Sequence, residues 1–279
     1  MARLSAKDKA AYQTRGFLIL KDPAVRRIKN DLMRDLKPIA LEIIRKTPPV
    51  SRHAAGLAKK PFGAIFDWSI RSEKDNAVTR VFYELFPTAF ATIGLAGHPF
   101  FTRVSRQLGV RHPLPSTLPI LRIDRPSEAR YLTPAHQDYW YSMLSDRSVT
   151  YWFPLLPVTE AMGPLWVVPG SHRAGLLPIK RWTAENPYAL KDDVNGSRYL
   201  PVFLKEDEVL VFSQYLIHKS GVNRSDRARI TIQVRHNDLT DLRVPTTSFT
   251  AKHSRFTEQA QQAWLQRSGR APSGGSRVG

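Results

Sequence analysis

The segment Pro134-Ala135-His136-Gln137-Asp138-Tyr139-Trp140-Tyr141 contains the two residues on which the interpretation of the whole chain depends. If this segment is extended, His136 and Asp138 point to one face, because side chains alternate along a strand, and Gln137 points to the other. Each of the two would then supply one ligand to a metal ion, and His218 is the best candidate for a third. Two imidazoles and one carboxylate form the facial triad that binds non-haem Fe(II) and leaves coordination positions open.

The composition is typical of a folded protein that contains no disulfides. The chain has 279 residues, 42% of them hydrophobic, and no cysteine, which removes disulfides, cysteine-based zinc sites and a thiol nucleophile. Residues 1–9 are charged and lack the apolar segment of a signal peptide, and no apolar run approaches membrane-spanning length. We therefore predict a cytoplasmic protein without membrane insertion.

The charge balance is strongly basic. The 42 lysines and arginines exceed the 24 acidic residues and give a net charge of +18. Such a balance attracts anions, which include nucleic acid, anionic lipid and small phosphorylated or carboxylated substrates. The excess is dispersed along the chain and forms no block of like charge of the kind found in nucleic-acid-binding tails. This distribution argues against direct nucleic-acid binding and is equally compatible with a solvated basic surface.

Two regions of different character follow each other along the chain. Residues 1–112 are predicted to be mostly helical, with a short strand at Phe17–Leu20, a loop at 50–74 and helices over 22–46, 76–95 and 99–108. Residues 113–237 consist of short β-like runs separated by turn residues, with an insertion at about 174–199. The runs lie at 119–123, 149–153, 164–168, 209–212 and 230–234.

This pattern predicts one domain. Many short strands with Pro/Gly turns are typical of a sandwich or barrel, the jelly roll included. We expect a single domain over 1–268, in which 1–112 is helical support, 113–237 is the barrel and 238–268 is a C-terminal extension. Residues 269–279, rich in Gly, Ser and Arg, are expected to be disordered.

Several motifs in this order resemble the phytanoyl-CoA dioxygenase family, a branch of the Fe(II)/2-oxoglutarate-dependent oxygenases. They are His136-Gln137-Asp138, the run Gly163 to His172, the run Ile217 to Asn223, and Arg229. The similarity extends over roughly residues 5–237, since residues 12–20 also look like the opening of the family. The resemblance implies a mainly β fold, a double-stranded β-helix (a jelly-roll or cupin-like barrel) with N-terminal helices flanking it.

The resemblance also implies roles for individual residues. The iron ligands would be His136, Asp138 and His218. Arg229, eleven positions after His218, matches the arginine that binds the distal carboxylate of 2-oxoglutarate, and a guanidinium suits a carboxylate chemically. Ser220 is implied as a hydrogen-bond partner of that co-substrate, and Trp152 as a neighbour of it, although Trp152 is equally compatible with core packing. Arg227 competes with Arg229 by position but lies in a predicted turn.

The implied reaction consumes O2 and 2-oxoglutarate and releases succinate and CO2, with hydroxylation of a small-molecule substrate as the default outcome. Substrate contacts are predicted at the barrel interior and its mouth, by Arg122, Tyr139, Trp140, Gln233 and Arg235. Arginines inside a barrel require an anion, so an anionic substrate is expected. The alternative for each arginine is that it pairs internally or lies at an exposed edge. For Arg122 the internal partner would be an acid such as Asp124.

Two other functions remain open from the sequence. One is a nucleic-acid-modifying oxygenase on the same fold, which the positive charge suits but which uses a different arginine spacing. The other is a non-catalytic jelly-roll binding protein. Succinate release that depends on 2-oxoglutarate and oxygen distinguishes an enzyme from a binding protein. The sequence leaves the identity of the substrate and the oligomeric state open.

Overall fold

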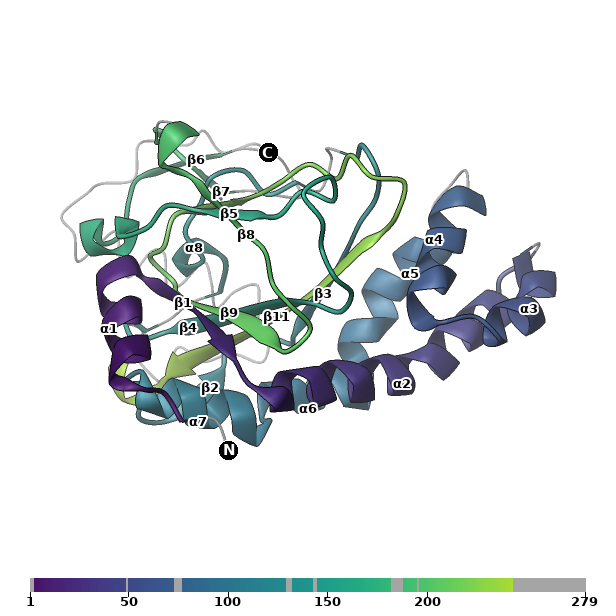
Figure 1. The fold of residues 1–279 in the computed structure, drawn as a ribbon, viewed down its shortest axis with the longest axis horizontal. Helices are drawn as coiled ribbons and strands as arrows, with labels where there is room; N and C mark the ends of the chain where they lie inside the picture. Colours follow the sequence, from purple (N-terminus) through teal and green to yellow (C-terminus); the bar gives the residue numbers. More distant parts are fainter. Residues whose placement is uncertain are drawn as a thin grey trace, which may run out of the picture.

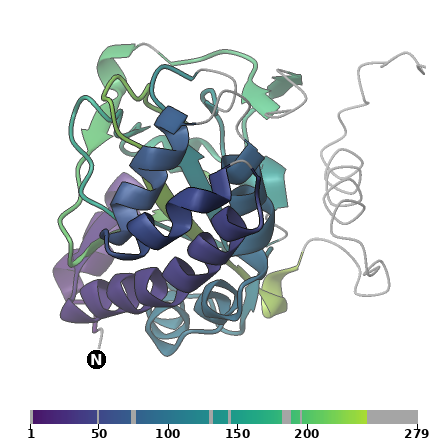
Figure 2. The same ribbon diagram turned by 90° about the vertical axis from the view of Figure 1, so that its right-hand side faces the viewer.

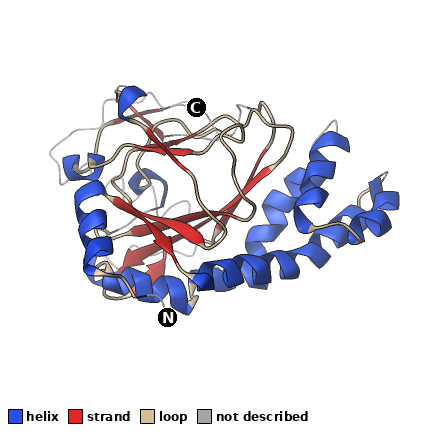
Figure 3. Ribbon diagram, viewed as in Figure 1, coloured by secondary structure: helices blue, strands red, loops and turns tan. Residues whose placement is uncertain are grey.

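Two antiparallel β-sheets face each other, and a layer of helices covers the outside of the larger sheet (Figures 1 and 3). The computed structural model describes residues 3–48, 50–72, 77–128, 132–142, 145–181, 188–194 and 196–242. The predicted extension beyond residue 242 and the predicted disordered tail lie outside this range. The strands that were predicted at five positions are all present, and β11 extends further than predicted.

The larger sheet has β11 near its centre. Its strands run in the order β1 (Phe17–Lys21), β9 (Glu208–Ser213), β4 (Val149–Pro154), β11 (Arg229–Asp238) and β2 (Pro113–Pro115), and β3 (Ile120–Asp124) also pairs with β11. The smaller sheet has the order β10 (His218–Ser220), β5 (Leu165–Val167), β8 (Leu200–Val202). A separate ribbon, β6 (Ile179–Arg181) and β7 (Tyr188–Leu190), lies within the predicted insertion.

The two faces of the larger sheet have opposite chemistry, as the alternation along β11 shows. Ile230, Ile232 and Val234 belong to the hydrophobic core formed with the helices. Residues 229, 231, 233 and 235 therefore point to the interior between the sheets, because side chains alternate along a strand. A second apolar cluster fills part of that interior and includes residues of both sheets. Its members are Phe17, Trp152, Leu165, Val167, Val202, Leu204, Leu210, Phe212 and Leu216.

Among the described residues, seven helices lie between residues 6 and 107, with β1 between the first two of them. They form the outer layer, seen from its side in Figure 2. They are α1 (Ala6–Arg15), α2 (Pro23–Arg45), α3 (Ala54–Ala58), α4 (Phe62–Ser72), α5 (Ala77–Leu85), α6 (Phe90–Ala96) and α7 (Pro99–Gln107). Shorter helical segments are η1 (Val50–His53), η2 (Phe86–Thr88), η3 (Ser171–Ala174), η4 (Gly196–Arg198), η5 (Leu239–Asp241) and α8 (Tyr139–Ser142). Among the described helices, none has the length and apolar character needed to cross a bilayer.

Two predictions for the helical region were wrong. The predicted loop at 50–74 contains η1, α3 and α4, because Ile65 and Phe66 are drawn into the core, where the Phe66 ring lies 5.1 Å from that of Phe82. The predicted single helix over 76–95 is divided between α5 and α6 by η2, which contains Pro87. Proline lacks the backbone N–H that a helix interior requires, so the helix cannot continue through it unchanged.

The chain that enters β5 and the chain that leaves β10 touch at a pair of glycines. Gly163 has φ of +71°, and a Cβ at this position would overlap the Val222 carbonyl. A Cβ at Gly221 would lie 2.5 Å from the Pro164 carbonyl oxygen. Glycine at both positions therefore allows these two segments, which flank the sheet that carries His218, to approach each other.

Gly163→Ala should destabilise the protein, because it combines backbone strain at positive φ with a clash against backbone that cannot move aside. We expect a loss of about 1–3 kcal/mol in the free energy of unfolding, measured by denaturant titration. Gly94→Ala is the matched control: Gly94 is exposed on α6 with open space around its Cβ position. This control should be neutral or stabilise by about 0.5–1 kcal/mol. Equal effects of the two substitutions would contradict the role of the glycine pair.

Candidate metal centre

His136 and His218 are joined by a reciprocal pair of backbone hydrogen bonds. The amide of His136 donates to the carbonyl of His218 over 3.0 Å, and the amide of His218 donates back over 3.1 Å. This isolated antiparallel bridge sets the two rings side by side, with centroids 4.1 Å apart. The segment around His136 is thus not a full strand: Asp138 already lies in the turn that leads into α8. The two side chains predicted to converge nevertheless do so.

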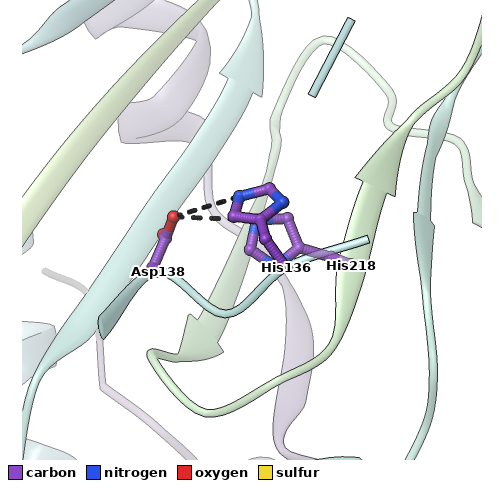
Figure 4. Close-up of side chains that lie close together, drawn as sticks. All are labelled: His136, Asp138 and His218. Carbon is purple, nitrogen blue, oxygen red and sulfur yellow. Dashed lines mark ion pairs between the residues drawn. The ribbon is translucent and has the colours of Figure 1, made fainter. Parts of the chain in front are cut away.

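The three candidate ligands face one another (Figure 4). Asp138 Oδ1 lies 3.6 Å from His136 Nε2 and 3.7 Å from His218 Nε2. Each histidine has its Nδ1 within hydrogen-bonding distance of a backbone carbonyl, Pro134 at 2.8 Å and Leu216 at 3.0 Å. A carbonyl only accepts, so Nδ1 carries the proton and donates, and Nε2 keeps its lone pair for a metal.

The electrostatics fit a divalent metal ion. All three side chains are buried. Burial lowers the pKa of His218 to about 3, with the neighbouring His136 as the next cause, so this imidazole is neutral at physiological pH. Burial by itself would raise the pKa of Asp138, but the Arg235 guanidinium and the two histidines outweigh it and hold that pKa well below its usual value. Two imidazoles and one carboxylate are the donor set that suits non-haem Fe(II).

Arg235 pairs with the candidate ligand Asp138, which the sequence did not indicate. It was predicted as a substrate contact, yet its Nη2 lies 2.8 Å from Asp138 Oδ1 and its Nε donates to Oδ2 over 3.2 Å. The Thr150 hydroxyl donates to the same Oδ2 over 2.7 Å. Arg235 and Thr150 stand opposite each other in the register of β11 and β4. Only this pairing of distant strands identifies them as partners of the ligand.

A second charged cluster lies at the start of β11, where Arg229 is the first residue of the strand. Asp124 Oδ2 accepts from Arg229 Nη2 at 2.9 Å and Nε at 3.1 Å, while its Oδ1 pairs with Arg122 Nη2 at 2.9 Å. The alternative stated for Arg122, internal pairing with Asp124, is therefore what the structure contains. Burial raises the pKa of Asp124, but the two arginines outweigh this effect and keep the carboxyl ionised.

The contacts of Arg229 limit how it can meet a carboxylate. Besides Asp124, its Nη1 donates to the carbonyls of Met162 and Gly221, each over 3.3 Å. These contacts engage four of the five N–H groups of the guanidinium, and the Nε/Nη2 edge already faces Asp124. Arg227 lies instead at the surface, where its 52% exposed side chain pairs with Asp67. Arg229, with a 4% exposed side chain, is the interior arginine.

Trp152, Ser220 and Gln233 all come from strands that border the interior. Trp152 is buried in the interior cluster with Leu210 and Phe212. Ser220 follows His218 by two residues on β10, so both point to the same face. Gln233 stands opposite Trp152 and accepts a hydrogen bond from Arg235 over 2.6 Å. Their roles toward 2-oxoglutarate and substrate stay predictions.

The aromatic run after Asp138 divides between two environments. Tyr139 and Trp140 are buried, with Tyr139 stacked on Tyr215 at 5.7 Å between ring centroids. Tyr141 is the member next to the metal ligands: its ring lies 5.1 Å from that of His136, edge to face. Tyr139 and Trp140 were predicted as substrate contacts, and Tyr141 was not. Its position beside His136 depends on the turn from Asp138 into α8, which the sequence did not indicate.

Gln137 ties the ligand segment to the insertion. Its Nε2 donates to the Gly175 carbonyl over 2.8 Å and to the Tyr215 carbonyl over 2.7 Å, and its Oε1 accepts from the Leu177 amide over 2.8 Å. The Tyr141 hydroxyl donates to the Tyr188 carbonyl on β7 over 2.9 Å. These hydrogen bonds hold the predicted insertion beside the candidate metal centre.

The chain matches the phytanoyl-CoA dioxygenase family over residues 12–231. It belongs to that family. Human peroxisomal phytanoyl-CoA dioxygenase is 22% identical over 247 residues, which cover 82% of this chain and 67% of the human protein. The 1-deoxypentalenic acid 11-beta-hydroxylase of Streptomyces arenae is 32% identical over 108 residues, which cover 36% of this chain and 38% of the hydroxylase. This match thus spans about two fifths of that relative.

Among solved structures, EctD from S. alaskensis with bound Fe has the same fold, with a TM-score of 0.53 at 18% identity; 85% of this chain and 78% of EctD are covered. The predicted resemblance and the predicted fold class are thereby confirmed.

Binding of a divalent metal should stabilise the protein through the three ligands. Fe(II) under anaerobic conditions, at about 100 times its Kd, is expected to add about 2.7 kcal/mol and raise the unfolding temperature. His136→Ala and His218→Ala should each lose this metal-dependent rise and all turnover. His53→Ala, which replaces an exposed histidine on η1, is the control and should retain both. Full metal stabilisation in either ligand variant would contradict the assignment.

Proposed function

We propose that this chain is an Fe(II)- and 2-oxoglutarate-dependent dioxygenase that hydroxylates an unactivated C–H bond of a small anionic metabolite. The overall reaction converts the substrate, O2 and 2-oxoglutarate into the hydroxylated product, succinate and CO2. One oxygen atom enters the product and the other enters succinate. Of the four electrons that reduce O2, two come from the oxidative decarboxylation of 2-oxoglutarate and two from the C–H bond of the substrate. The relatives named above include a hydroxylase of a carboxylic acid, which supports this reaction type.

The observation that carries the proposal is the buried His136/Asp138/His218 group, in which both Nε2 atoms face Asp138 Oδ1. Bound iron would supply the activation of oxygen, and the protein would hold it through three ligands on one side. The remaining coordination positions would then serve co-substrate and oxygen. The aromatic rings beside the ligands, Phe212 at 4.8 Å from the His218 ring and Tyr141 beside His136, shield this point from bulk water.

Arg229 would hold the distal carboxylate of 2-oxoglutarate. The guanidinium is buried and keeps its orientation through Asp124, Met162 and Gly221. Because its fork edge faces Asp124, we expect the co-substrate to meet Nη2 and to need a second donor. The candidate is the Ser220 hydroxyl on β10 of the smaller sheet. Asp124 in this arrangement fixes the arginine and also lowers its net attraction for other anions.

The anionic substrate is supported by the charges of the barrel interior. Arg122, Arg229 and Arg235 face Asp124 and Asp138, which leaves one positive charge among these five side chains. A divalent metal adds two positive charges and the 2-oxoglutarate dianion removes two. These five side chains together with the metal and 2-oxoglutarate would therefore carry a net charge of +1, which favours the entry of an anion. Arg122, with a 16% exposed side chain, is the most accessible of the three arginines.

Arg229→Ala should raise the 2-oxoglutarate concentration needed for turnover, because it strands the distal carboxylate. The expected loss is about 2–5 kcal/mol, or about 30-fold to several-thousand-fold in affinity. The measurement is succinate release in air with Fe(II) and a metabolite extract as the substrate source. Arg227→Ala is the matched control and should behave like wild type. If the wild-type protein binds Fe(II) but releases no succinate, the proposed dioxygenase activity is wrong.

Arg122→Gln should impair substrate use without changing the affinity for 2-oxoglutarate. The measurement is the stimulation of succinate release by small carboxylic acids, compared with their methyl esters. Acids should stimulate wild type more than esters do, and Arg122→Gln should remove that difference, since the lost guanidinium is the recognising group. Stronger stimulation by neutral compounds in the wild type would contradict an anionic substrate.

A further inference from the structure

Asp138 is held from two sides by groups that are not metal ligands. Arg235 reaches both of its oxygens, Oδ1 over 2.8 Å and Oδ2 over 3.2 Å. Thr150 adds a hydrogen bond to Oδ2 over 2.7 Å. The carboxylate is fully buried and the arginine side chain is 7% exposed, so water competes little with either contact. Arg235 is itself oriented by Gln233, whose Oε1 accepts from Nη2 over 2.6 Å.

The two oxygens of Asp138 therefore differ. Oδ1 accepts one donor, Arg235 Nη2 at 2.8 Å, and faces the histidines, at 3.6 Å and 3.7 Å from their Nε2 atoms. Oδ2 is turned toward the larger sheet and receives two donors, one of them charged. Charge-assisted hydrogen bonds are the stronger kind, and a carboxylate oxygen that already accepts two donors is a poor ligand for a metal. The donors come from neighbouring positions on two paired strands, so they move little relative to each other.

Denticity matters for this type of site. A carboxylate that binds through both oxygens fills an additional coordination position. Co-substrate and oxygen together need every position that the three protein ligands leave open on an octahedral metal. A device that restricts Asp138 to one oxygen would thus keep the site open to both.

We propose that Arg235 and Thr150 are positioning residues that restrict Asp138 to binding the metal through Oδ1 alone. This proposal rests on the proposed function, because it assumes that His136, Asp138 and His218 hold the metal. It replaces the predicted role of Arg235 as a substrate contact: to bind a substrate anion, Arg235 would have to leave a buried carboxylate. Arg122 remains the candidate for that task.

The test uses Co(II) as the probe, because its visible absorption reports the number and geometry of its ligands. Thr150→Val removes one neutral hydrogen bond at nearly constant volume, and Arg235→Lys keeps the charge but loses the two-point contact. Both variants should show an altered Co(II) absorption spectrum and Co(II) affinity that is weaker by about 10–100-fold. Thr133→Val is the matched control: Thr133 is a buried threonine whose hydroxyl contacts Arg122 over 2.6 Å. It should keep the wild-type spectrum and affinity.

The outcomes separate the two proposals. Wild-type spectra and equal or tighter Co(II) binding in both variants would show that Arg235 merely competes with the metal for Asp138, and would overturn the positioning role. The same spectral change in Thr133→Val would show a general disturbance of the barrel and would also overturn it. A wild-type protein that binds no Co(II) would defeat the proposed function and this inference together. Because Thr150→Val is neutral and conservative, the test holds even if an Arg235 variant folds poorly.

Discussion

The reciprocal backbone bridge between His136 and His218 is the interaction on which the candidate site depends. It joins residues 82 positions apart in the sequence. The two imidazole rings are tilted relative to each other, with 4.1 Å between their centroids. Antiparallel residues that exchange both hydrogen bonds have side chains on the same face. The carbonyls that receive the Nδ1 protons lie two residues before each histidine, so the same local geometry repeats on both sides. Asp138 lies two residues after His136 and is the third member of the candidate ligand group.

Strand β11 connects this centre with the rest of the fold. Its apolar residues hold the larger sheet against the helices, while the alternate positions carry Arg229 and Arg235 into the interior. Each arginine meets a buried aspartate, Asp124 and Asp138 respectively. A register shift of one residue would exchange the two faces and bury the charges among phenylalanines of the helical layer. Core packing and placement of the charges are therefore one constraint, which explains why the strand is so extensively buried.

Much of the fold and of the ligand set was predictable. Strand positions followed from apolar runs between turn residues. The three candidate ligands that the structure brings together followed from His-x-Asp and the motif around His218. The failures were of another kind. Residues 50–72 form short helices that are stabilised by aromatic contacts with Phe82 and Phe86. The residue pattern within this segment does not predict contacts with such distant residues. The pairing of Arg235 with Asp138 was also not predictable, because the sequence does not say which acid lies within reach of this arginine.

Sequence by itself determined the chemical groups of the site and the family to which the chain belongs, since both depend on residue types at short, ordered spacings. The tertiary structure alone decided how those groups are partnered: Arg122 and Arg229 on Asp124, Arg235 and Thr150 on Asp138, and Tyr141 beside His136. The physical reason is the distance along the sequence over which each kind of information acts. A motif specifies neighbours along the chain, whereas ion pairs and hydrogen bonds between strands depend on separations of about 3 Å that only the register of the sheets sets.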